Sequence, residues 1–111
     1  MAAFSVDVVG KPAGFIVKLS GRAGGPESEQ LEEQLNRLVA LKPQMIVVDM
    51  TGLEYLSSMG VSALIRLHRS MKEAGGKTAL ASVPDAMLKL LQSVKLDNLM
   101  PIYGKAADAL P

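Results

Sequence analysis

Two adjacent serines, Ser57 and Ser58, stand where their hydroxyl groups could take part in chemistry. Apolar residues recur at helical spacing from position 61 to position 71, so the serines lie at the start of a predicted helix. The unpaired N–H groups and the dipole at a helix start favour an anion. A phosphate on either hydroxyl would therefore be stabilised by its own helix, and Gly60 would let another surface come close.

The same two serines also have a purely structural interpretation. Serine directly before a helix is most often an N-cap, which contributes about 1 kcal/mol. The two roles can coexist, because Ser57 can cap the helix while Ser58 is presented outward. The spacing alone leaves both interpretations open.

No other group of residues suggests a catalytic or metal centre. The only histidine, His68, follows Ser58 by three helical turns on the same predicted helix, and no Gly-x-Ser-x-Gly motif is present, so a serine hydrolase triad is not expected. Cysteine is absent, which excludes a thiolate nucleophile and a thiolate metal site. A glycine-rich loop followed by Lys-Ser/Thr, which would bind a nucleotide, is also missing. We therefore expect a protein that is not an enzyme and has no metal or cofactor.

The predicted helix at 58–74 carries a histidine and a group of basic residues, and both have an ordinary structural explanation. His68 falls on or beside its apolar stripe, where packing or a surface hydrogen bond is the expected role. Arg66, Arg69 and Lys72 form a basic patch, interpreted as a solvated face that could also help to dock an acidic partner.

Length and charge limit the classes of protein to which the chain could belong. The 111 residues suit a single domain covering positions 1–111. Twelve Lys and Arg residues against eleven Asp and Glu argue against a nucleic-acid partner, which requires a strong basic bias. No apolar run approaches the roughly 20 residues that span a bilayer, and residues 1–7 do not resemble a secretion signal. The expected location is the cytoplasm, without membrane insertion.

The strands and helices that would position the two serines are predicted from hydrophobic periodicity. Strands are predicted where apolar residues alternate or run continuously, at residues 4–8, 15–19, 45–48, 78–81 and 102–103. Helices are predicted where apolar residues recur every three or four positions, at residues 27–41, 58–74, 82–96 and 106–110. The Gly- and Pro-rich residues 20–26 are predicted as a loop, and residues 51–54 as a turn. Ser82, three positions before Asp85, is typical of a helix start.

These elements predict an α/β fold with a mixed sheet of four to five strands. The first two strands form an N-terminal hairpin, and the helices pack against the sheet. The strand at 45–48 is predicted to be buried on both faces and to end at Asp49. Because open α/β folds place their sites at the carboxyl edge of the sheet, Asp49 and the two serines are expected there together.

The stretch from 47 to 64, VVDMTGLEYLSSMGVSAL, resembles the signature region of STAS domains. In that family a buried strand ends in Asp or Asn, and a short loop leads to a helix start similar to Asp-Ser-Ser/Thr-Gly. The order of elements is similar over almost the whole chain, including residues 19–21 after the second strand and residues 83–84 before the third helix. The resemblance implies a STAS-like fold.

The resemblance also implies roles for individual residues. Ser58 matches the serine that a partner anti-sigma-factor kinase phosphorylates, and Asp49, Ser57, Met59 and Gly60 match positions of the surface that faces this partner. The sequence departs from the family pattern at Ser57, where many members have Asp, and at Met59, where many have Ser or Thr. A third departure is Gly24, where an acidic residue is common.

By this resemblance the chain is an anti-sigma-factor antagonist in bacterial partner switching. It would bind a kinase-type anti-sigma factor, phosphorylation of Ser58 would end the binding, and a phosphatase could reset it. The catalytic groups would belong to the kinase. The three departures keep open an alternative, a STAS accessory subunit of a transporter or a signalling complex that binds without a phosphate cycle. The oligomeric state is left open.

Overall fold

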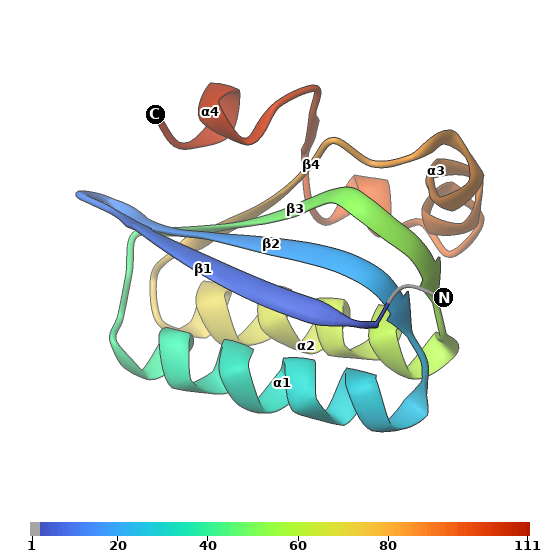
Figure 1. Cartoon of the computed structure of the whole chain (residues 1–111). Coiled ribbons are helices and arrows are strands. Elements are labelled where there is room, and N and C mark those ends of the chain that lie inside the picture. Colours follow the sequence, from blue (N-terminus) through green and yellow to red (C-terminus); the bar gives the residue numbers. More distant parts are fainter. Residues whose placement is uncertain (1–2) are drawn as a thin grey trace.

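A five-stranded sheet in the order β1-β2-β3-β4-β5 forms the centre of the computed structural model, which describes residues 3–111 (Figure 1). The strands are β1 (Ser5–Lys11), β2 (Gly14–Ala23), β3 (Met45–Leu56), β4 (Lys77–Ala81) and β5 (Ile102–Tyr103). The helices are α1 (Gly25–Ala40), α2 (Ser58–Glu73), α3 (Asp85–Ser93) and α4 (Ala106–Ala109), with a 3₁₀ turn at Leu96–Asn98. β1 and β2 pair antiparallel as a hairpin, whereas the other neighbours pair parallel. The predicted mixed sheet with an N-terminal hairpin is confirmed.

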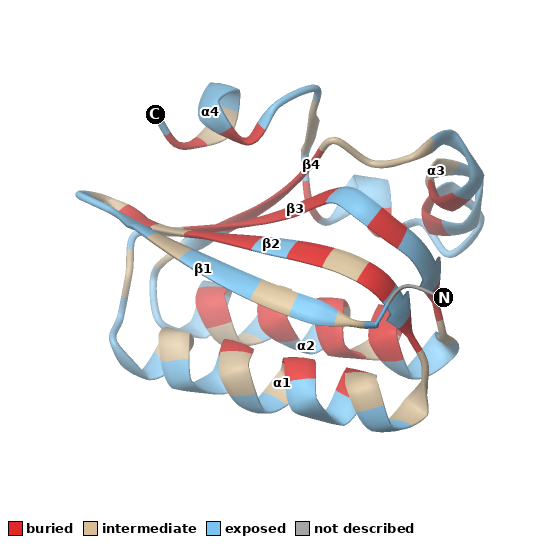
Figure 2. Cartoon of the chain, viewed as in Figure 1, coloured by how far each residue is buried: buried red, intermediate tan, exposed pale blue. Residues whose placement is uncertain are grey.

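The main hydrophobic core lies between the sheet and the pair α1 and α2, which cover one face (Figures 1 and 2). Alternate residues of β3, among them Ile46 and Val48, point into it and meet Leu35 of α1 and Leu64 of α2. On the opposite face a smaller cluster joins Val47 to the C-terminal segment around α4. β3 is therefore covered on both sides, which explains its continuous apolar run.

β2 and β3 are both longer than predicted. β2 continues through residues expected in the loop 20–26, and β3 continues through the expected turn at 51–54. The pairing register shifts twice, so that β3 carries one extra residue at each shift, the mark of a β-bulge. Gly52 permits the first shift, because a Cβ there would lie 2.8 Å from the Cβ of Ser20. Gly21 and Gly52 therefore lie at bulges within strands, and β3 does not end at Asp49.

The helix ends mostly agree with the prediction. α2 ends at Glu73, and Gly75 follows with a φ of 83°, a conformation that favours glycine. The predicted helix start at Ser82 is wrong in detail, because this residue has a φ of 53° and its hydroxyl donates to the carbonyl of Gly104 at 3.0 Å. α3 begins at Asp85 without a side-chain cap. Within the described part of the chain, no helix has the length and apolar character needed to cross a membrane.

Candidate functional site at the start of α2

The two longest helices begin at the same edge of the sheet. β2 and β3 run parallel, and each leads directly into a helix, α1 and α2 respectively (Figure 1). The amide of Ser57 donates to the carbonyl of Ala23 at 2.9 Å, which ties the two strand ends together just before the helices start. The partial positive charges of two helix N-termini therefore meet at this edge.

Ser57 is the N-cap of α2, as predicted. Its hydroxyl oxygen accepts a hydrogen bond from the amide of Gly60 at 3.3 Å. The same oxygen lies 3.2 Å from the hydroxyl of Ser28, an α1 residue that is only 2% exposed. The cap thus joins the first turns of both helices.

Ser58 is the first residue of α2, and its side chain is exposed. Among residues 3–111, no hydrogen bond engages its hydroxyl, in contrast to the hydroxyl of Ser57. The first turn of α2 contains no acidic residue. Chemically, the arrangement offers a free hydroxyl at a helix start whose backbone amides can stabilise an added anion.

Met59 and Gly60 continue the site in different environments. Met59 is 46% exposed and lies over the start of α1, because a Cβ on Gly25 would contact its sulfur at 3.4 Å. Gly60 is buried, and a Cβ there would lie 2.4 Å from Cδ1 of Leu56 and 3.1 Å from the hydroxyl of Ser28. The surface that comes close at Gly60 is therefore part of the same chain.

Asp49 lies away from the serines, contrary to the expectation that it stands beside them at the sheet edge. The end of β3 at Leu56 lies seven positions further along the chain, which corresponds to roughly 20 Å of extended strand. Its carboxylate accepts hydrogen bonds from the amide of Thr51 at 3.0 Å and from the hydroxyl of Thr51 at 2.6 Å. Asp49 is nearly buried and supports the first bulge of β3.

Arg22 and Tyr55 flank the site, although sequence reasoning did not select them. They are paired in the register of β2 and β3, and the guanidinium of Arg22 lies 4.7 Å from the centre of the Tyr55 ring. Both side chains are exposed. Arginine and tyrosine are enriched at the centres of protein interfaces. The signal was hidden because Arg22 fell in a predicted loop.

The central helix has no second cluster of catalytic type. Nδ1 of His68 lies 3.2 Å from the hydroxyl of Thr78, so its predicted role in hydrogen bonding is confirmed. Arg66 of the basic patch pairs with Glu32 of α1. The described residues contain no group of three or more His, Cys, Asp or Glu side chains placed to hold a metal ion.

The Ser57 cap gives a first testable expectation. Ser57→Ala should destabilise the fold by about 1–3 kcal/mol, because it removes the cap and leaves the buried Ser28 hydroxyl without this partner. Ser58→Ala is the matched control, and its exposed hydroxyl predicts a change below about 0.5 kcal/mol. Urea denaturation monitored by circular dichroism measures both. Equal stability of the two variants would contradict the assignment of the cap.

Comparisons with known proteins agree with the fold described above. The family model described as STAS domain matches residues 5–109. An anti-sigma F factor antagonist of Paenibacillus polymyxa is 26% identical over 97 residues, which cover 86% of this chain and 83% of that protein. The crystal structure of an anti-sigma factor antagonist from Mycobacterium paratuberculosis is similar with a TM-score of 0.87 at 22% identity, and the match covers 96% of this chain and 91% of that one.

A second solved structure is the Bacillus cell fate determinant SpoIIAA in its phosphorylated form. It superposes with a TM-score of 0.76 at 20% identity, and 96% of each chain is covered. These structures share the mixed five-stranded sheet and its helices. The family match extends over nearly all of the described sequence, from β1 to α4. The chain therefore belongs to the STAS domain family.

Proposed function

We propose that the chain acts in the cytoplasm as a single-domain anti-sigma-factor antagonist, switched by phosphorylation of Ser58. In this proposal the unmodified surface around α2 binds a kinase-type anti-sigma factor and withdraws it from a sigma factor. One observation carries the proposal: Ser58 is exposed at the start of α2, while Ser57 alone makes the capping hydrogen bonds. Support also comes from the relatives, which are named anti-sigma factor antagonists.

The phosphate would be added where the fold can accept it. A phosphoserine brings about 1.5 to 2 negative charges and three acceptor oxygens. The first turn of α2 holds no acidic side chain, so the dipole of this helix favours the anion. Because the hydroxyl of Ser58 makes no hydrogen bond within residues 3–111, modification would leave the backbone unchanged and alter mainly the surface charge.

The surroundings of Ser58 suit a protein partner. Arg22, Tyr55 and Met59 are all exposed, and each belongs to a residue type that is enriched in interfaces. Asp49 and Gly60 are buried, so neither would contact the partner directly. Gly60 would support the start of α2 from inside the fold, whereas Asp49 would stabilise β3 away from the serines. We therefore place the centre of the proposed interface on the exposed side chains at the ends of β2 and β3 and at the start of α2.

Phosphate mapping tests the proposal. Incubation with the kinase-type anti-sigma factor of the same host and ATP should place one phosphate on Ser58, detected by mass spectrometry of peptides. Ser58→Ala should abolish the incorporation, whereas Ser57→Ala should retain it, because the adjacent hydroxyl is engaged in the cap. Absence of phosphate on Ser58, together with stable co-purification with a transporter, would favour the accessory-subunit alternative.

A further inference from the structure

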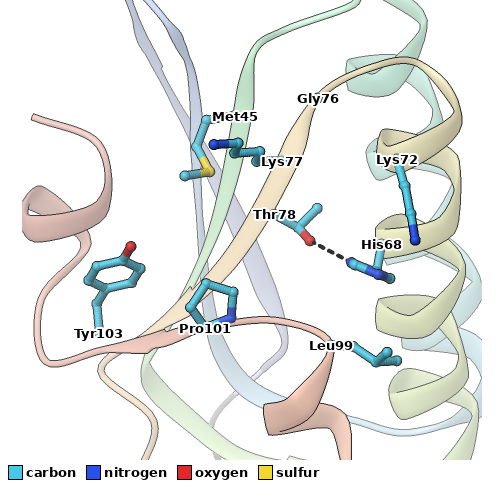
Figure 3. Close-up of a pocket in the computed structure, with 9 residues that line it drawn as sticks. All are labelled: Met45, His68, Lys72, Gly76, Lys77, Thr78, Leu99, Pro101 and Tyr103. Carbon is cyan, nitrogen blue, oxygen red and sulfur yellow. Dashed lines mark hydrogen bonds between the residues drawn. The ribbon is translucent and has the colours of Figure 1, made fainter.

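A pocket of about 360 Å³ lies well away from Ser58, between the second half of α2, β4 and the segment that leads into β5 (Figure 3). His68 and Lys72 line it from α2, and Thr78 lines it from β4. Leu99 and Pro101 close it from the segment before β5. Its size falls at the lower end of the range for small-molecule sites, about 300–1,000 Å³.

The pocket exists because β5 is too short to cover the edge of β4. The amide of Leu80 donates to the carbonyl of Pro101 at 2.9 Å, and the amide of Ser82 donates to the carbonyl of Tyr103 at 3.0 Å. In a strand, residues two apart turn their backbone groups to the same side, so Thr78 faces this side as well. β5 begins opposite Leu80, so within residues 3–111 Thr78 pairs with β3 on one side and has no strand on the side of β5. A stretch of backbone edge therefore lines the pocket.

The polar groups of the pocket have one sign of charge. Lys72 and Lys77 are exposed, but their side chains lie on opposite sides of β4, so Lys72 is the cation on the side of His68 (Figure 3). No acidic side chain is among the described residues that line the pocket. His68 and Lys72 are four positions apart on α2, so their side chains share a face (Figure 3). The bond between His68 and the 5% exposed Thr78 fixes the imidazole at the pocket wall. These groups complement a negatively charged ligand.

The remaining wall is apolar. Leu99 is 45% exposed, although it is a large aliphatic residue, and it lines the pocket together with Pro101 (Figure 3). Met45 and Tyr103 contribute further carbon surface from β3 and β5. An inorganic anion would leave this surface in water, whereas an anion with an apolar body would cover it.

We propose that this pocket binds a small organic anion. A carboxylate or phosphate head group lies beside Lys72 and His68, and the apolar body of the ligand packs on Leu99 and Pro101. The inference is independent of the proposed switch, because no residue around Ser58 lines the pocket.

Titration of the ¹⁵N-labelled protein, followed by NMR, tests the site with four probes. Hexanoate and phenyl phosphate combine a charged head with an apolar body, 1-hexanol lacks the charge, and inorganic phosphate lacks the body. We expect saturable shifts of the amides of His68, Thr78 and Leu99 with hexanoate or phenyl phosphate, and the tighter of the two identifies the head group. The amide of Ser58 should not move.

The substitution Lys72→Met should weaken binding of the tighter probe at least about tenfold, since a charge-assisted contact is lost. Lys72 is exposed, so the fold is retained. Lys89→Met, which removes an exposed charge from α3 outside the pocket, should bind as the unaltered protein does. Equal binding of hexanoate and 1-hexanol, unchanged affinity in the Lys72→Met variant, or no shift at the pocket would each overturn the proposal.

Discussion

Ser58→Glu is expected to weaken binding to the kinase-type anti-sigma factor by several kcal/mol, an affinity loss of about a hundredfold or more. The reason is that Ser58 lies in the proposed interface, where a carboxylate would lose part of its hydration when the partner binds. Isothermal titration calorimetry with the purified anti-sigma factor measures the effect. Ser58→Gln is the matched control, because it has nearly the same size as Glu without the charge.

The same substitution should act on the fold with the opposite sign. A carboxylate in the first turn of α2, which holds no acidic residue, should stabilise the free protein by about 0.3–1 kcal/mol through the helix dipole. Urea denaturation of Ser58→Glu and Ser58→Gln separates this effect from binding. Equal affinities of the Ala, Gln and Glu variants for the anti-sigma factor would rule out the charge switch.

Gly60→Ala should destabilise the fold by about 1–3 kcal/mol, although alanine is the better helix former. The added Cβ would meet the buried Leu56 at 2.4 Å and the hydroxyl of Ser28 at 3.1 Å. Ser28 is held by its contact with Ser57, so it cannot move away freely. The strain therefore outweighs the gain in helix propensity, which is about 1 kcal/mol. Thermal and urea denaturation measure the change.

Gly104→Ala is the control for this substitution, because a Cβ at Gly104 would have no neighbour within 4 Å. Its stability should change by less than about 0.5 kcal/mol. Leu56→Val, which trims the side chain met by the new Cβ, should partly rescue Gly60→Ala, so that the double variant loses less than the sum of the single changes. Strict additivity would show that the two positions are not in contact.

Much of the fold could be predicted because its signals are local in the sequence. The apolar run at 45–48 predicts a strand covered on both faces, and the periodicity after Ser58 predicts α2 together with its starting point. Capping by Ser57 could be predicted for the same reason, because its hydroxyl oxygen and the donating amide of Gly60 are only three positions apart.

The extensions of β2 and β3 could not be predicted, because they depend on pairing between segments far apart in the chain. Residues 51–54 have the composition of a turn, yet the bulged register with β2 makes them strand. Asp49 was accordingly placed at the edge of the sheet, whereas it lies inside β3.

The candidate site shows the same division between local and distant contacts. Ser57 and Ser58 were found from neighbouring positions, but Ser28 and Arg22 reach the site only through tertiary structure. Neither residue carries a local pattern that differs from that of an ordinary helix or loop. Such members of a site become visible only when the register of parallel strands is known.

The two bulges have a consequence for how chain length can vary within this architecture. The paired residues 45–49 of β3 have a regular register with both neighbouring strands, so an insertion there would turn every later side chain to the wrong face. Within residues 3–111, β3 pairs from Gly52 onward with β2 alone. The pairing of these two strands already accommodates one extra residue of β3 at each bulge. Evolution can therefore lengthen or shorten this half of β3 by a residue while Ser58 keeps its place.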